Sequence, residues 1–320
     1  MKKAITILTL SISTFAFGQF PSDAHEAISI NNINATVGTN GSFFQDGANP
    51  GFEVPVNSGA HTIYSGSLWI GGLSSTGMLH TAAVTYVQDM AQDYWPGPVS
   101  DLAYYVAADS TWNRLWKVSA QEINSHIWNY WQSTYSIPEA ILNWPAHGDI
   151  SKGQAANLAP FNDANGNGLY EPMQGDSPKI KGDEAVYFIM NDDRLPHTGS
   201  NGEKMRIEVH GMVYGFNCAN SEALFNTLFI DYKIINRSQY SYDDTFIGFF
   251  MDFDIGGYSD DYMACDVNRS SFYAYNGDSL DNPSAGAAGY GTSPPAQSLT
   301  FLKGPLQDYD GVDNSFGISN

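Results

Sequence analysis

The sequence predicts a mainly β protein: an antiparallel β-sandwich-like domain with one or two short helices and long Asp/Asn/Gly-rich loops. In the second half of the chain, apolar residues recur at every second position over several short segments, which is the period of a strand. Clusters of Gly, Pro, Asn and Asp separate these segments, as turns do. Helical spacing with capping residues is confined to a short central region, so we expect helices to decorate a sandwich.

Charge and composition exclude two classes of protein. The 320 residues include 14 Lys and Arg against 34 Asp and Glu, a formal net charge of −20. A nucleic-acid binder needs a basic surface against phosphate, so we expect no nucleic-acid partner. Hydrophobic residues make up 42% and aromatic residues 14%, more apolar surface than a disordered acidic segment carries. We therefore expect the chain to fold around a sizeable core.

Residues 1–18 have the pattern of an export signal. Two lysines precede an apolar run from Ala4 to Phe17, and Ala16 and Gly18 take the −3 and −1 places of a signal-peptidase site. As a helix this run is about 21 Å long, short of the roughly 30 Å hydrocarbon core of a bilayer. We predict a cleaved signal peptide, no later transmembrane segment, and a secreted or cell-surface protein.

The chain after the signal peptide divides into a lead-in and a domain. Residues 19–60 are rich in Asn, Gly, Ser and Pro, which predicts a lead-in with at most short strands. Residues 61–71 and 78–87 are β-prone and flank a Gly/Ser turn, as in a hairpin. We assign residues 61–320 to one β-rich domain.

The clearest helix is predicted to start at Ser119, because Glu122 three residues later completes a capping box. Ser136 and Glu139 repeat the box ahead of a short helical turn that stops before Pro145. In the first helix, apolar side chains at helical spacing predict a single apolar face. They are Ile123, Ile127, Tyr130 and Trp131.

Three strands are predicted in the second half, over residues 205–213, 228–235 and 247–253. In the first of them, Glu208 and His210 share a polar face; such a pair suits two metal ligands, but is more often solvated surface. From residue 278 onward the chain reads as loops and stops near another acidic turn, which suggests the front part of a longer protein.

The sharpest motif is an acidic loop that resembles the first half of an EF-hand-type calcium loop. Side-chain oxygens alternate along it, Gly168 occupies the sixth position for the turn, and a backbone carbonyl follows. Gln174 stands where an EF-hand has its bidentate Glu, and the bland interpretation is an Asx-rich turn without an ion. The predicted calcium ligands are Asp163, Asn165, Asn167, Leu169, Glu171 and Asp176, with Asp183 a more distant candidate.

A second acidic cluster contains Asp252, Asp254, Asp260, Asp261 and Asp266. The first two are two residues apart and so share a strand face. A Gly-Gly pair then lets the chain fold back and bring the later carboxylates close. Carboxylates this close repel unless a cation neutralises them or some are protonated, so a second calcium ion is one hypothesis and side chains splayed into water the other.

Paired carboxylates also allow a hydrolase, since glycoside hydrolysis uses two of them. Tryptophans could stack on sugar rings, although tryptophans in a helical pattern are more often core. The relevant residues are Trp95, Trp112, Trp116, Trp128 and Trp131. Motifs for serine hydrolases, zinc proteases, P-loops and Cys-x-x-Cys sites are not found, so we name no catalytic residue.

Two questions stay open from the sequence. Cys218 and Cys265 either form a disulfide, which export would permit, or remain free thiols. His61, His147 and His197 are isolated in sequence, so a Ser/His/Asp arrangement formed only in space remains an alternative.

Several blocks in one order resemble a large uncharacterised family of exported Bacteroidota proteins. The resemblance covers roughly residues 60 to 280, and ordered blocks are more specific than any one motif. It implies a secreted or cell-surface protein of the type exported by the type IX secretion system, and brings no catalytic residues. Among the blocks are Leu68-Trp69-Ile70-Gly71-Gly72, Trp95-Pro96-Gly97-Pro98, Trp144-Pro145-Ala146-His147-Gly148 and the acidic loop from Asp163.

Together these observations predict an exported, calcium-stabilised binding or structural module of the adhesion type. Its partner would be an extracellular polysaccharide or a cell-surface protein. A secreted hydrolase of polysaccharide or peptide is the first alternative. A non-catalytic front scaffold of a longer multidomain protein is the second.

Overall fold

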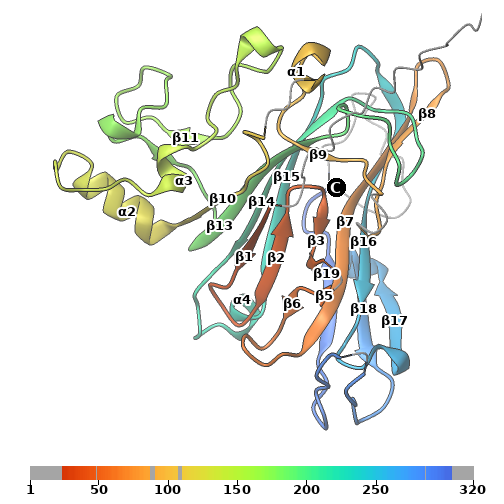
Figure 1. The fold of residues 1–320 in the computed structure, drawn as a ribbon. Helices are drawn as coiled ribbons and strands as arrows, with labels where there is room; N and C mark the ends of the chain where they lie inside the picture. Colours follow the sequence, from red (N-terminus) through yellow and green to blue (C-terminus); the bar gives the residue numbers. More distant parts are fainter. Residues whose placement is uncertain (1–23, 48, 87–90, 107–109, 285, 305–320) are drawn as a thin grey trace, which may run out of the picture.

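The computed structural model describes residues 24–47, 49–86, 91–106, 110–284 and 286–304. The predicted signal peptide and the acidic turn at residues 308–313 lie outside these residues. Two antiparallel sheets packed face to face form the body of the molecule, and a lobe with most of the helices projects from one side (Figure 1). The predicted mainly β, antiparallel sandwich-like class is thereby confirmed.

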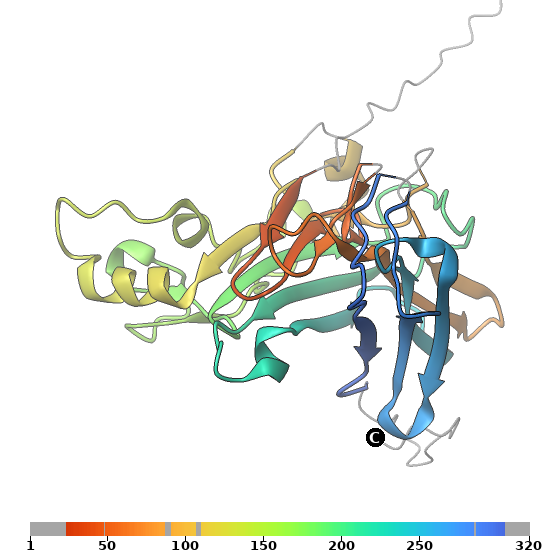
Figure 2. The same cartoon turned by 90° about the horizontal axis from the view of Figure 1, so that it is seen from below.

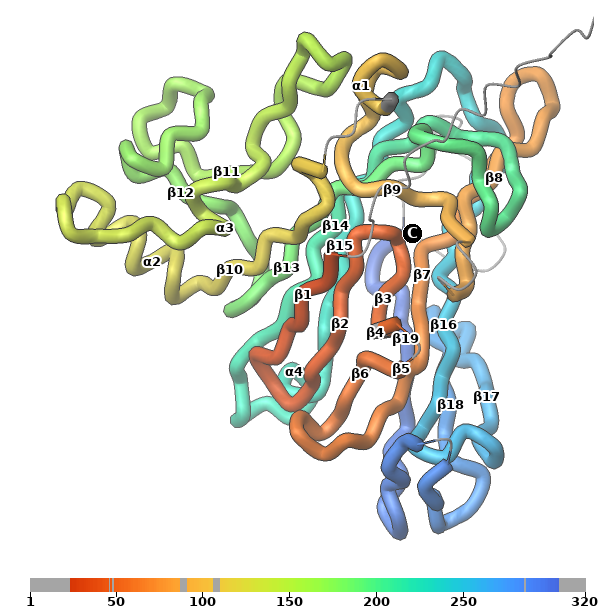
Figure 3. The backbone as a smooth tube through the Cα atoms, in the orientation of Figure 1, coloured from red at the N-terminus to blue at the C-terminus, as the bar shows by residue number. Residues whose placement is uncertain are grey.

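The first sheet contains most of the N-terminal strands, and β16 lies at its edge. The strand order is β1-β2-β3-β7-β16, and β6 and β8 also pair with β7. Its members are β1 (His25–Ile28), β2 (Asn34–Gly38), β3 (Ser42–Phe43), β6 (Phe52–Glu53), β7 (His61–Ser74), β8 (Leu79–Ala82) and β16 (Tyr242–Phe253). The small hairpin β4 (Gln45–Asp46) and β5 (Asn49–Pro50) lies beside it. Apart from this hairpin, the described strands within the predicted lead-in, residues 19–60, thus join this sheet: β3 and β6 pair directly with β7, and β2 pairs with both (Figure 3).

The second sheet has the order β10-β13-β14-β15, with β9 paired to β13. Its strands are β9 (Trp95–Pro96), β10 (Trp116–Ser119), β13 (Glu184–Asn191), β14 (Ile207–Gly215) and β15 (Leu228–Asn236), and α4 (Glu222–Phe225) precedes β15. A third sheet follows β16 and projects from the body (Figure 2). It contains β17 (Asp261–Asp266), β18 (Ser271–Asn276) and β19 (Ala296–Thr300), with short 3-10 turns at Tyr258–Asp260 and Val267–Arg269.

The second sheet separates two apolar cores. One face packs on the first sheet, where Phe43, Leu68 and Phe188 are almost completely buried. The other face packs on the lobe through Tyr187 and Trp144, whose ring centroids are 4.9 Å apart. Apolar burial on both faces stabilises the sheet by roughly 25 cal/mol per Å² removed from water.

Burial on both faces corrects the sequence interpretation of β14. The exposed fractions of Glu208 and His210 are 0% and 5%, so the polar face is not solvated. The lobe and the segment around Val99 cover it, and Val99 donates its N–H to Glu208 at 2.9 Å. An alternating pattern predicts a strand but does not reveal that a second layer covers its polar side.

The lobe contains α1 (Leu102–Val106), α2 (Ala120–Asn129), α3 (Glu139–Leu142), the hairpin β11 (Phe161–Asn162) and β12 (Ser177–Pro178), and 3-10 turns at Ile150–Lys152 and Pro172–Gln174. The predicted capping box at the start of α2 is present, with both reciprocal Ser119 and Glu122 bonds. The second predicted box is wrong: Pro138 is the N-cap of α3 and no side chain caps the helix. Proline disfavours helical backbone in the residue before it, which keeps Ser136 outside the helix start.

Candidate functional site

Trp128 on α2 and Trp131, two residues beyond the end of α2, are the most exposed aromatic side chains of the lobe. The exposed fractions of Trp128 and Trp131 are 75% and 71%, whereas Trp95 and Trp116 are almost completely buried and Trp112 is half-buried. The indole N–H of Trp131 donates to the carbonyl of Trp128 at 3.1 Å. Of the five tryptophans proposed for sugar stacking, these two therefore keep their ring faces accessible.

The buried face of α2 differs from the predicted one. Ile123 is buried as predicted, but Ile127 and Trp131 are exposed, and His126 is completely buried instead. His126 makes a 3.0 Å hydrogen bond through Nε2 to the carbonyl of Asp176. A histidine with a carbonyl partner is accommodated in the interior, so the helix turns its larger apolar side chains outward.

The acidic loop is anchored directly beneath this helix. Gly175 has a φ of +100°, and a Cβ at this position would lie 2.9 Å from the ring of Tyr130. The side chain of Asp176 is fully buried, and its two oxygens accept the N–H groups of Ala164 (2.8 Å) and Glu171 (2.7 Å). Asp176, at the end of the motif, thus closes the loop and holds it against α2.

The start of the loop has the Asx geometry that its sequence suggests. Asp163 accepts the N–H groups of Gly166 and Gly168, both at 2.7 Å. These backbone hydrogen bonds hold the pKa of Asp163 below its ordinary value, and the bond from Gly168 has the largest effect on it. Both glycines have positive φ, which lets the chain wrap around the carboxylate.

Three amide side chains converge on Glu171. Asn165 and Gln174 lie within hydrogen-bond distance of its carboxylate, at 3.3 and 2.5 Å, and Asn167 donates to it at 2.5 Å. The backbone of Leu169 donates to the Asn167 side chain, and its own side chain is exposed. The loop is thus a ring of oxygen-bearing side chains centred on one carboxylate.

The oxygen atoms of this loop are of the kinds that bind a hard cation, because calcium takes carboxylate, amide and carbonyl oxygens as ligands. The amide N–H groups of Asn165 and Asn167 donate to Glu171, while their amide oxygens accept the backbone N–H groups of Asn167 and Leu169. Within the described part of the chain, no three His, Cys, Asp or Glu side chains gather as a group that could hold a metal ion. An ion here would therefore depend on amide and backbone oxygens as well as carboxylates.

The second acidic cluster is brought together only in part. The chain folds back after Gly256, and Asp261 accepts the N–H of Ile255 at 2.8 Å. Burial, together with the charges of Asp252 and Asp261, raises the pKa of Asp254 to about 6. Burial also raises the pKa of Asp261, and Asp260 contributes to this shift.

Asp266 does not join this group. It lies at the far end of β17, caps the turn that follows and pairs with Arg269. Two residues that the sequence did not indicate do join it. Tyr86 donates its hydroxyl to Asp252 at 2.8 Å, and the buried Asp281 accepts the N–H of Gly257 at 2.7 Å. No local sequence signal marks either, because both come from segments distant along the chain.

The structure shows the surroundings of the two cysteines and of His197. Cys218 is half-buried and Cys265 exposed, and both are free thiols. His197 makes hydrogen bonds through both ring nitrogens to carbonyl oxygens, of Thr81 at 2.7 Å and of Asp192 at 2.8 Å. Neither nitrogen is left to activate a serine hydroxyl, so His197 does not form a Ser/His/Asp site.

Glu208 and His210 belong to a buried hydrogen-bonded chain. His210 bonds Glu208 at 2.9 Å and the hydroxyl of Tyr187 at 2.9 Å, and Arg237 donates to Glu208 at 2.7 Å. Burial would raise the pKa of Glu208, but the bonds from His210 and Arg237 outweigh it and lower the pKa below its ordinary value. These four residues thus form a structural hydrogen-bonded network on the second sheet.

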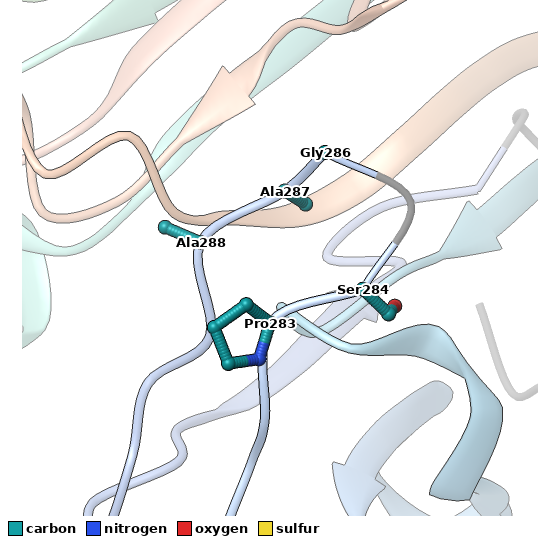
Figure 4. A pocket seen from close by; sticks show the side chains of 5 residues that line it. All are labelled: Pro283, Ser284, Gly286, Ala287 and Ala288. Atoms are coloured by element: carbon teal, nitrogen blue, oxygen red, sulfur yellow. The ribbon is translucent and has the colours of Figure 1, made fainter.

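A surface hollow of about 410 Å³ lies in the loop after β18 (Figure 4). Pro283, Ser284, Gly286, Ala287 and Ala288 line it. None of these carries a titratable side chain, so the hollow brings no pair of carboxylates face to face, as a glycosidase cleft would.

None of the helices that the structure describes has the length and apolar character to cross a membrane. Comparisons of the chain with protein-family models, with curated proteins and with solved structures each find no match.

Proposed function

We propose that this protein is a secreted or cell-surface, calcium-stabilised binding module of the adhesion type that recognises a polysaccharide through α2. The observation that carries the proposal is the exposure of Trp128, 75%, on a helix whose opposite side is anchored by His126, and of Trp131, 71%, in the turn that follows the helix. Exposed indole rings on a rigid element provide contact area at a small cost in conformational entropy.

The chemistry of this helix face fits a neutral, hydroxyl-rich partner. Asn124 lies one turn before Trp128 on α2 and is exposed, and Trp131 follows the end of the helix. The ring faces can cover the apolar side of a sugar, while the amide can exchange hydrogen bonds with hydroxyl groups. Residues 120–129 contain no Lys or Arg, which argues against an anionic membrane or nucleic acid as the partner.

Calcium would act on the support of this face rather than on the ligand. Asp163, Asn165, Asn167, Glu171 and the carbonyl of Leu169 would hold the ion, with Asp176 closing the loop. Because Asp176 and Gly175 contact His126 and Tyr130, an ordered loop would fix the orientation of α2. The export pattern of residues 1–18 and the resemblance to exported Bacteroidota proteins support a location where calcium reaches millimolar levels.

The test is binding of residues 19–320 to a panel of soluble and insoluble polysaccharides, measured by affinity electrophoresis and sedimentation. We expect at least one polysaccharide to be retained, and the double variant W128A/W131A to lose at least tenfold in affinity. F246A/Y258A is the matched control, because Phe246 and Tyr258 are exposed aromatic side chains outside the lobe.

Three results would contradict the proposal. Retention that is equal in W128A/W131A and the wild type would move binding away from α2. Release of new reducing ends during incubation would instead favour the hydrolase alternative. Absence of binding across the panel, with the fold intact by circular dichroism, would leave the scaffold alternative as the better description.

A further inference from the structure

Four aromatic rings from separate parts of the chain meet on the outer face of the first sheet. Trp69 on β7 stacks on Phe250 of β16, with centroids 5.5 Å apart and planes 7° apart. Tyr86 stands perpendicular to Phe250 at 5.6 Å and 85°, and Tyr64 meets Tyr86 at 5.9 Å. We call these four residues the aromatic corner.

The corner is partly open to solvent, since Trp69 is exposed and Tyr64, Tyr86 and Phe250 are half-buried. Trp69 is 38% exposed, and Phe246, which shares the outer face of β16 with Phe250, is 64% exposed. Gly248 lies between Phe246 and Phe250 on β16 and directly opposite Trp69 on β7. A Cβ at Gly248 would meet only Trp69, at 4.0 Å. The Trp69 indole N–H donates to the carbonyl of Val84 at 2.6 Å, which fixes the ring in place.

Two carboxylates adjoin the rings. Asp252 shares the outer face of β16 with Phe250, and Asp254 follows directly after the strand ends at Phe253. Tyr86 links ring and acid through its 2.8 Å hydrogen bond to Asp252. Among the described residues no Lys, Arg or His forms an ion pair with either acid, and the charges that act on Asp254 are those of Asp252 and Asp261. Negative charge at this corner is therefore uncompensated within the described chain.

The geometry favours an organic cation over a metal ion. An inorganic ion needs several oxygens around one point, and no group of acids in the described part of the chain provides that. A guanidinium group is delocalised and an ammonium group is a compact charge on a flexible stem; either can donate to a carboxylate and is attracted to ring faces within about 6 Å. A neutral sugar would leave the like-charge repulsion unrelieved.

We propose that the aromatic corner, with Asp252 and Asp254, binds a lysine or arginine side chain of a partner protein. The openness of the surface favours a side chain presented by a protein over a small cation, which needs enclosure on several sides to bind well. The net charge of −20 would further steer a basic partner to the molecule. This site is separate from the tryptophans of α2 and goes beyond the proposed polysaccharide binding.

The experiment is isothermal titration calorimetry at low salt with residues 19–320 and three short, end-blocked peptides, in which glycines flank one lysine, one arginine or one norleucine. Norleucine keeps the length of the lysine stem without its charge. We expect the lysine and arginine peptides to bind at least tenfold more tightly than the norleucine peptide. Tetramethylammonium chloride is titrated in parallel and is expected to bind more weakly than either basic peptide.

Variants separate the site from general electrostatics. D252N/D254N and F250L should each weaken the basic peptides at least tenfold. D243N/D244N removes the same charge from the exposed opposite end of β16 and should change affinity less than twofold. Circular dichroism and a thermal melt confirm that each variant is folded before titration.

Three outcomes would overturn the proposal. They are equal binding of the norleucine and lysine peptides, equal losses in D252N/D254N and D243N/D244N, and tighter binding of tetramethylammonium than of the peptides. The last result would identify a site for a small free cation instead.

Discussion

The imidazole Nε2 of His197 lies 3.6 Å from the carboxylate of Asp192, and both side chains are fully buried. Asp93 approaches the other nitrogen at 3.8 Å. Each nitrogen also lies within hydrogen-bond distance of a carbonyl oxygen, of Thr81 at 2.7 Å and of Asp192 at 2.8 Å. The buried ring therefore joins the loop around Asp192 to β8.

Replacing His197 by Phe should therefore destabilise the protein strongly. The change removes both buried hydrogen bonds of the ring and leaves the carbonyl oxygens of Thr81 and Asp192 without this partner, for which we expect a loss of about 2–4 kcal/mol in the free energy of unfolding. Urea unfolding of wild type and H197F measures it. A loss below about 0.5 kcal/mol would contradict this role for the ring.

Neutralising Glu208 should destabilise the protein. E208Q keeps the shape but removes the charge that Arg237 and His210 share, and we expect a loss of about 2–4 kcal/mol at pH 7. The folded-state pKa of Glu208 is lowered, so its contribution is present above the ordinary value of 4.5 and is lost as the pH falls through the folded value. The stability gap between wild type and E208Q should therefore narrow in acid; a gap independent of pH would contradict this.

Asp254 should give the opposite pH dependence. Its folded-state pKa of about 6 is above the ordinary value of 3.8, so its favourable contribution is complete below pH 3.8 and is lost as the pH rises through 6. We expect D254N to gain about 1–2 kcal/mol relative to wild type between pH 4 and pH 7, with partial exposure reducing the effect. Denaturant unfolding across this range measures the difference, and D243N should show no such trend.

Calcium should stabilise the protein modestly. An extracellular site with a dissociation constant of about 10⁻⁴–10⁻³ M would add roughly 1–2 kcal/mol at 5 mM calcium, a rise of a few degrees in the melting temperature. We expect this increment over excess chelator to vanish in D163A. D149A removes a comparable turn carboxylate elsewhere in the lobe and should keep it. Identical melts with calcium and chelator would leave the loop a turn without an ion.

A methyl group at Gly211 should not fit. A Cβ there would lie 2.0 Å from the ring of Phe188, which is completely buried on the neighbouring strand. We expect G211A to cost about 1–3 kcal/mol through overpacking. Thermal unfolding measures this, and G248A is a control, since a Cβ at Gly248 meets open space. Equal effects of the two changes would refute the packing argument.

Local signals were sufficient for several elements. The capping box at Ser119 depends on residues three apart and is present in the structure. The Asx geometry at Asp163 likewise depends on its own neighbours, Gly166 and Gly168, and the loop forms as the spacing suggests. The strands and their antiparallel arrangement follow from period-2 patterns and turn clusters.

Patterns that depend on distant partners were less informative. Ile127 and Trp131 lie on a helical apolar face in sequence, but the loop at Asp176 selects His126 for burial instead. The polar side of β14 reads as solvated, but the lobe covers Glu208. Sequence periodicity records which residues share a face, whereas it carries no information on which layer packs against that face.

The sequence by itself determined the mainly β class, the start of α2 and the acidic loop, because each follows from interactions between residues close along the chain. Only the tertiary structure decided which tryptophans are exposed, which groups surround His197, and that Tyr86 meets Asp252. These depend on contacts between segments as far as 166 residues apart, as for the last pair. Such contacts form when sheets and lobe pack, so burial and charge pairing were settled only at that level.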